Sequence, residues 1–126
     1  MLLATLVIGI TLTGGCTGEE TEAETPNPEP AQIAENISAQ EAYALIQENQ
    51  GNPDFVIIDL RPPEEFAEER IEGAINLDYH DEAFQDEVEE LDRDKTYLIY
   101  YTCSCGYVGQ KTLFTMADLG FREVHN

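Results

Sequence analysis

The sequence predicts an α/β domain with a largely parallel sheet. Short apolar runs rich in β-branched or aromatic residues, such as 55–58 and 97–101, have the length and composition of buried strands. Between these runs lie segments whose apolar residues recur at helical spacing. Strands that alternate with helices favour parallel pairing, because each parallel connection has to cross over the sheet.

The first predicted helix begins near residue 39. Ser38 followed by Glu41 matches a capping box, in which each residue satisfies a free amide of the other. Apolar residues within 42–46 then share one helical face, and Gly51 follows the last of them. The run 55–58 comes next and reads as the first buried strand.

The remaining elements follow from the same signals. Residues 62–65 open a helical turn, because proline is tolerated in the first turn and acidic residues favour the positive end of the helix dipole. We predict a short strand at 74–77 and an acidic helix at 81–91. After the strand 97–101 we predict a helix at 109–119 and a last strand that begins at 123.

Charge excludes several classes of function. The 126 residues include 26 Asp and Glu against 6 Lys and Arg, which gives a formal net charge of −20. Nucleic-acid binding needs a basic footprint, and electrostatic docking on an anionic membrane needs basic clusters, so neither is expected. Three cysteines in a chain of this size do not form a disulfide scaffold.

The N-terminal third divides by composition. Residues 1–15 carry no charged side chain, and their apolar run is too short to span a bilayer. Small residues lead into Cys16, and the segment resembles a lipoprotein signal, although no basic residue precedes the apolar run. We therefore expect a signal peptide at 1–15 and a lipid on Cys16. The alternative is an unprocessed apolar terminus with an incidental cysteine.

Residues 16–35 follow as an acidic linker rich in Pro, Glu and Thr, too poor in apolar residues to fold alone. The domain is then expected at 36–126. With this organisation the protein is exported, its domain lies on the extracytoplasmic side, and it meets the membrane only through the lipid anchor.

One loop carries the chemistry. Cys103, Ser104, Cys105, Gly106, Tyr107, Val108 and Gly109 lie between the predicted strand 97–101 and the helix that follows. The free amides and positive dipole of a helix start favour a thiolate, and glycines let the backbone curl around the sulfur. The loop therefore predicts a cradle for a nucleophilic cysteine.

Separated motifs resemble the rhodanese-like sulfurtransferase family in its single-domain form. Segment 56–66 is similar to the family's hydrophobic-Asp-x-Arg pattern followed by Glu and an aromatic residue, segment 71–77 to its Ile-Pro-Gly-Ala-x-Asn motif, and segment 119–126 to its Leu-Gly-Phe…Val-Tyr-Asn motif. The resemblance covers about 36–126 and implies a three-layer fold with a mainly parallel sheet and helices on both faces. It stops before the family's usual Gly-Gly turn and last packing element, so we expect the C-terminal part of the fold to be truncated.

The resemblance implies that Cys103 is the catalytic nucleophile and that residues 104–109 form the substrate-binding loop. The expected activity is transfer of a sulfane sulfur through a persulfide, with no cofactor and no metal. Partners would be a small sulfur donor or a persulfide-carrying protein. Two alternatives stay open: a thiol–disulfide redox protein that uses Cys103 and Cys105, and a catalytically silent module that binds a partner.

This chain departs from the family pattern in the loop, where Ser104 and Val108 stand at positions that are often Arg. Without a cation in the loop, and with a net charge of −20, we predict slow turnover of the thiosulfate dianion that rises with ionic strength. Asp59 and Arg61 are interpreted as structural, with Arg61 pairing to a glutamate of the next turn, Glu64 or Glu65. His125 is interpreted as packed or exposed and not catalytic.

Overall fold

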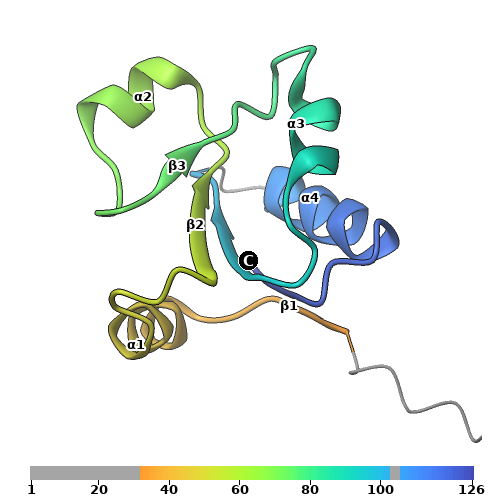
Figure 1. The fold of residues 1–126 in the computed structure, drawn as a ribbon. Coiled ribbons are helices and arrows are strands. Elements are labelled where there is room, and N and C mark those ends of the chain that lie inside the picture. Colours follow the sequence, from red (N-terminus) through yellow and green to blue (C-terminus); the bar gives the residue numbers. More distant parts are fainter. Residues whose placement is uncertain (1–31, 103–105) are drawn as a thin grey trace, which may run out of the picture.

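A parallel sheet in the order β1-β5-β4-β2-β3 forms the centre of the molecule (Figure 1). The structure is a computed structural model that describes residues 32–102 and 106–126. The strands of this part are β1 (Ile33–Glu35), β2 (Phe55–Asp59), β3 (Ile75–Asn76), β4 (Thr96–Tyr100) and β5 (Glu123–His125). The helices are α1 (Ala39–Glu48), α2 (Pro63–Glu68), α3 (Phe84–Glu90) and α4 (Tyr107–Asp118).

The register of the central strands sorts their side chains onto two faces. Ile57 pairs with Leu98 and Ile58 with Ile99, so successive residues alternate between the faces. Figure 1 shows α1 and α2 on one side of the sheet and α3 and α4 on the other. The expected α/β fold with a parallel sheet between two helical layers is confirmed.

The larger core lies under α3 and α4. It joins Ile58 and Ile99 of the central strands to Val88, Leu113 and other residues that are almost fully buried. The core under α1 and α2 is smaller and has Ile57 and Leu98 at its centre. No residue of α1 or α2 is buried, whereas five residues of α4 are. The side of the sheet that carries α4 is therefore the better packed of the two.

The capping box at the start of α1 is confirmed. The Ser38 hydroxyl accepts a hydrogen bond from the Glu41 amide at 3.2 Å, and the Glu41 carboxylate accepts one from the Ser38 amide at 2.7 Å. The hydrogen bond from the Ser38 amide, together with a second one from the Ser38 hydroxyl, lowers the pKa of Glu41. The helix ends at Glu48, before Gly51 as the sequence indicates.

Strand β1 is the element that the sequence pattern did not indicate. It lies within the residues assigned to the linker 16–35 and pairs with β5, Ile33 opposite Glu123. Its three residues are all exposed, so they carry no alternating apolar signal, and the partner lies at the other end of the domain. In the described ranges no helix is long and apolar enough to cross a membrane.

Candidate functional site

The carboxyl ends of β2 and β4 and the start of α4 meet at one edge of the sheet, where open α/β sheets bind their ligands. Strand β4 ends at Tyr100, and α4 begins at Tyr107. Cys103, Ser104 and Cys105, like Cys16, lie outside the described residues. The described site is therefore the frame on both sides of these three loop residues.

Gly106 turns the chain into α4. Its φ of 61° and ψ of 0° are left-handed, a conformation that glycine adopts at no steric cost. Its carbonyl accepts the first helical bond, from the Gln110 amide at 3.1 Å. Within the described residues no side chain caps this helix, and its first turn holds no acidic residue. The first-turn amides and the positive dipole end therefore lie next to the cysteine-bearing segment.

Gly109 allows close contact between α4 and the end of β5. A Cβ at this position would lie 2.0 Å from Asn126 Oδ1, far inside van der Waals contact. Asn126 Nδ2 donates to Asn36 Oδ1 at 2.7 Å, and Asn36 Nδ2 donates to Gln110 Oε1 at 2.8 Å. These side-chain hydrogen bonds connect three elements: Asn126 follows β5, Asn36 follows β1, and Gln110 lies in the first turn of α4. They therefore fix where the helix begins.

A buried ion pair fixes the ends of β2 and β4. The Asp59 carboxylate, 0% exposed, accepts from Arg61 Nη2 at 2.7 Å and from the Tyr100 hydroxyl at 2.6 Å. Burial alone would raise the pKa of Asp59, but these hydrogen bonds and the guanidinium charge together lower it. The Tyr100 oxygen also accepts from the Ile71 amide at 3.2 Å, and Asn76 Nδ2 donates to the carbonyls of Asp59 and Arg61.

Arg61 therefore pairs first with Asp59, a partner that the helical spacing rule did not suggest. The expected glutamate is also present, because Arg61 Nη1 lies 3.7 Å from Glu65 Oε2. The same Glu65 oxygen lies 3.5 Å from the hydroxyl of Thr102, the last described residue before the cysteines. This network connects α2 to Thr102 and leaves the Arg61 side chain only 12% exposed, in agreement with a structural role.

Aromatic side chains and one lysine flank the other side of the loop. His80 Nε2 lies 3.3 Å from the Tyr101 hydroxyl, and the Tyr79 ring contacts the His80 ring edge to face at 5.4 Å. Lys111 Nζ lies 5.9 Å from the ring centres of both Tyr79 and Tyr107. Sequence reasoning missed Lys111, although its spacing of four from Tyr107 places both on one helical face.

The described loop residues separate into two kinds. Gly106 and Tyr107 are exposed, Tyr107 by 60%. Val108 and Gly109 are buried, and the Val108 side chain belongs to the core under α4. Val108 therefore has only its backbone to offer at this edge.

His125 is buried in β5, which lies next to β1 at the end of the sheet farthest from β3. Its Nδ1 lies 3.2 Å from Glu35 Oε1 of β1, and its Nε2 lies 3.0 Å from Glu123 Oε1. The contact with His125 is the main reason that the pKa of Glu123 is lowered. Residues 32–102 and 106–126 contain no group of three His, Cys, Asp or Glu side chains that could hold a metal ion.

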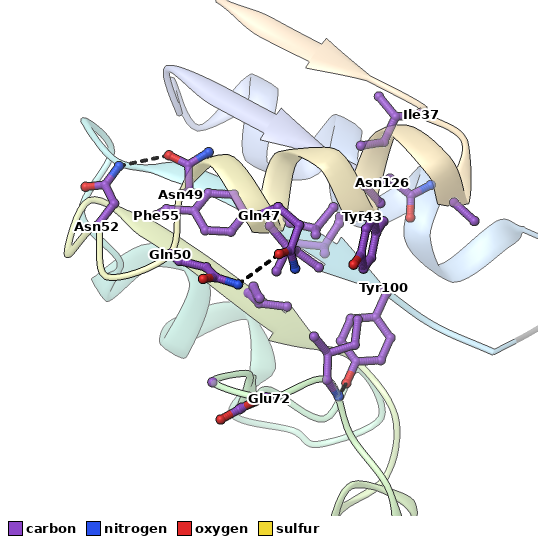
Figure 2. A pocket seen from close by; sticks show the side chains of 18 of the residues that line it. Ile37, Tyr43, Gln47, Asn49, Gln50, Asn52, Phe55, Glu72, Tyr100 and Asn126 are labelled. Atoms are coloured by element: carbon purple, nitrogen blue, oxygen red, sulfur yellow. Dashed lines mark hydrogen bonds between the residues drawn. The ribbon is translucent and has the colours of Figure 1, made fainter.

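A groove of about 1030 Å³ lies between α1 and the sheet (Figure 2). Tyr43 of α1 lies opposite Tyr100, Gln47 of α1 accepts a hydrogen bond from Gln50, and Asn126 lines one end. The groove thus reaches the carboxyl edge through Tyr100, on the side of the sheet away from Lys111.

The chain is similar to known proteins over this same region. Residues 38–126 match the family described as rhodanese-like domain. The chain is 31% identical over 90 residues to a thiosulfate sulfurtransferase GlpE of Coxiella burnetii, an alignment that covers 71% of this chain and 77% of that protein.

Solved structures show the same fold. A rhodanese-related protein from Thermoplasma volcanium superposes with a TM-score of 0.53 at 22% identity, over 74% of this chain and 81% of that one. A polysulfide-sulfur transferase homodimer from Wolinella succinogenes gives a TM-score of 0.51 at 23% identity, over 75% and 66% of the two chains.

Proposed function

The chain belongs to the rhodanese-like domain family, and we propose that it is a sulfurtransferase that carries a sulfane sulfur as a persulfide on Cys103. One observation carries the proposal: Cys103 falls in the sequence between the end of β4 and the left-handed Gly106 that opens α4. A helix start that closely follows a strand end favours a nucleophilic thiolate between them, because the first-turn amides and the positive dipole end of the helix lie next to it. The name of the Coxiella burnetii relative supports thiosulfate as the first donor to test.

The reaction consists of two displacements at sulfur. The Cys103 thiolate attacks the outer sulfur of thiosulfate, the sulfur–sulfur bond breaks, and sulfite leaves with the bonding electron pair. A nucleophilic acceptor, such as a thiolate or cyanide, then attacks the outer sulfur of the persulfide. The Cys103 thiolate leaves with its electron pair, so a neutral sulfur atom has moved and the enzyme is regenerated.

The frame around the loop supplies what these steps need. Each intermediate is an anion, and backbone amides at the start of α4 stabilise anions without a side-chain base. Gly106 and Gly109 let the chain turn and let α4 begin close to Asn126. We assign Ser104 and Cys105 to the wall of the cradle, together with the backbone of 106–109.

Mass spectrometry of the intact protein after exposure to thiosulfate tests the proposal. We expect a gain of one sulfur atom, absent in Cys103→Ala and retained at least in part in Cys105→Ala, the matched loop control. A loss of two hydrogens across the two thiols would instead identify a redox protein. No change under either condition would identify a binding module without catalysis. Transfer that survives Cys103→Ala and is lost in Cys105→Ala would move the nucleophile by two residues.

We also propose that the domain is exported and held at the membrane by a lipid on Cys16. The apolar residues 1–15 and the acidic, proline-containing linker after Cys16 support this arrangement. Cys16→Ser should release the protein from the membrane fraction, whereas Cys105→Ala should not. Unchanged membrane association with residues 1–15 still attached would contradict the anchor.

A further inference from the structure

Lys111 is placed differently from the other five basic residues. Arg93, Lys95 and Arg122 lie just before or at the start of β4 and β5, the edge of the sheet opposite the loop. Arg61 is paired with Asp59, and Arg70 stacks on the Phe66 ring at 4.8 Å. Lys111, in the second turn of α4, is the basic residue that lies beside Gly106 and Tyr107.

Two aromatic rings from different elements hold the Lys111 ammonium. The rings of Tyr79, which precedes α3, and Tyr107, which begins α4, both lie 5.9 Å from its Nζ. Tyr79 is itself fixed, since its ring packs edge to face against the buried Phe84 at 5.3 Å. The Tyr79 hydroxyl, followed by the charge interaction with Tyr107, raises the pKa of Lys111. The lysine is therefore oriented and positively charged at neutral pH.

A shallow cavity of about 570 Å³ connects Lys111 to the start of α4. Gly106, Tyr107, Gln110 and Lys111 line one end, and Asp118 lines the other. At the Gly106 end an anion would meet both the positive helix terminus and the ammonium, whereas the carboxylate of Asp118 repels an anion from the far end. The charge distribution thus favours an anion next to the loop.

We propose that Lys111 is the specificity-determining residue that makes this site accept an anionic sulfur donor, such as thiosulfate. The inference rests on the proposed sulfur transfer and deepens it. The net charge of −20 repels a dianion at long range, and the loop itself supplies no basic side chain. Lys111 provides attraction at short range, where the donor has to stay bound while the thiolate approaches it.

The test compares steady-state thiosulfate turnover in Lys111→Gln, Lys111→Arg and the matched control Lys95→Gln. Lys111→Gln and Lys95→Gln each remove one positive charge, so the long-range repulsion is the same in both. Lys95 is a half-buried residue at the opposite edge, and its ammonium donates to the Pro53 carbonyl at 3.2 Å. Any difference between the two variants therefore reports the local position of the charge.

We expect Lys111→Gln to raise KM for thiosulfate about three- to tenfold with kcat unchanged, the size expected when an exposed charge acts on a dianion. Lys111→Arg and Lys95→Gln should stay within about twofold of wild type. The difference between Lys111→Gln and Lys95→Gln should shrink as salt is added, because salt screens exposed charges.

The outcomes separate the two proposals. Equal KM values for Lys111→Gln and Lys95→Gln, with active wild type, overturn the role of Lys111 and leave sulfur transfer standing. A fall in kcat at unchanged KM also overturns it, because Lys111 would then act on the chemical step and not on donor binding. If wild type takes no sulfur from thiosulfate or from polysulfide, the proposed function fails and the inference fails with it.

Discussion

Replacing Asp59 with Asn should be among the most destabilising single changes in this domain. The carboxylate is fully buried and accepts from the Arg61 backbone amide at 2.9 Å, from Nε and Nη2, and from the Tyr100 hydroxyl. The Arg61 side chain is only 12% exposed, so water can replace few of the hydrogen bonds that the guanidinium loses with the carboxylate. Breaking a buried pair by removing one partner costs about 3–5 kcal/mol.

Asn keeps the volume of Asp and one accepting oxygen, so we expect the lower end, about 3 kcal/mol. Small domains are stable by about 5–15 kcal/mol, so this is a large fraction of the total. For a domain of roughly this size, 3 kcal/mol lowers Tm by about 12–24 °C. Urea unfolding followed by far-ultraviolet circular dichroism gives the free energy directly, and the sequence has no Trp to serve as a fluorescent probe.

Two control variants remove weaker contacts of the same network and should cost less stability than Asp59→Asn. Tyr100→Phe removes one bond to the carboxylate and leaves the ion pair, so it should cost about 1.5–3 kcal/mol. Glu65→Gln removes the more distant and half-exposed partner of Arg61 at 3.7 Å and should cost less than about 0.5 kcal/mol. A loss below about 1 kcal/mol for Asp59→Asn would refute the reasoning, because a buried guanidinium would then be stable without its counter-ion.

Two further predictions concern acid and the glycine beside β5. The pKa values of Asp59 and Glu123 are lowered from 3.8 and 4.5, so both carboxylates stabilise the fold fully above these ordinary values and lose that contribution as pH falls through their lowered pKa values. The free energy of unfolding should therefore decrease as pH falls below about 4.5, less steeply in Asp59→Asn. Gly109→Ala should turn the Asn126 side chain away from Asn36, and the helix gain of about 1 kcal/mol should offset the lost bond, so unfolding changes by less than about 1 kcal/mol. Sulfur-transfer turnover in this variant should nevertheless fall about ten- to a hundredfold, because the start of α4 loses the Asn126–Asn36 bond that positions it, and unchanged turnover would count against a positioning role.

Local signals predicted most of the fold. The capping box at Ser38 and the runs 55–58 and 97–101 act within a few residues, and the structure has α1, β2 and β4 at these places. β1 was not predicted, because its three exposed residues form a strand only by pairing with β5. A pairing between the two ends of the domain leaves no pattern in the local sequence.

In the site, too, the features with a local sequence signal were predicted and those that depend on tertiary packing were not. The sequence predicted a loop at 103–109 between a strand and a helix, and β4 and α4 frame such a loop. The expected boundary was wrong, because α4 begins at Tyr107, so that 107–109 form its first turn instead of belonging to the loop. It did not predict that Lys111 meets Tyr79, because Tyr79 lies in the segment before α3, and only the tertiary packing brings this segment beside α4. The partner of Arg61 was predicted from helical spacing, and the spacing rule could not anticipate Asp59, which reaches it from the end of a strand.

The amide link between Asn36 and Asn126 can form only late in synthesis. The two residues are 90 positions apart, so this contact closes one of the longest loops in the domain. As the chain leaves the ribosome, β2, β3 and β4 can pair before β5 exists, whereas β1 has no partner until residues 123–125 emerge. Since Asn126 also lies against Gly109, the contact that fixes the start of α4 beside the cysteine-bearing loop forms only after Asn126 has emerged, and shorter chains would hold a formed central sheet without that contact.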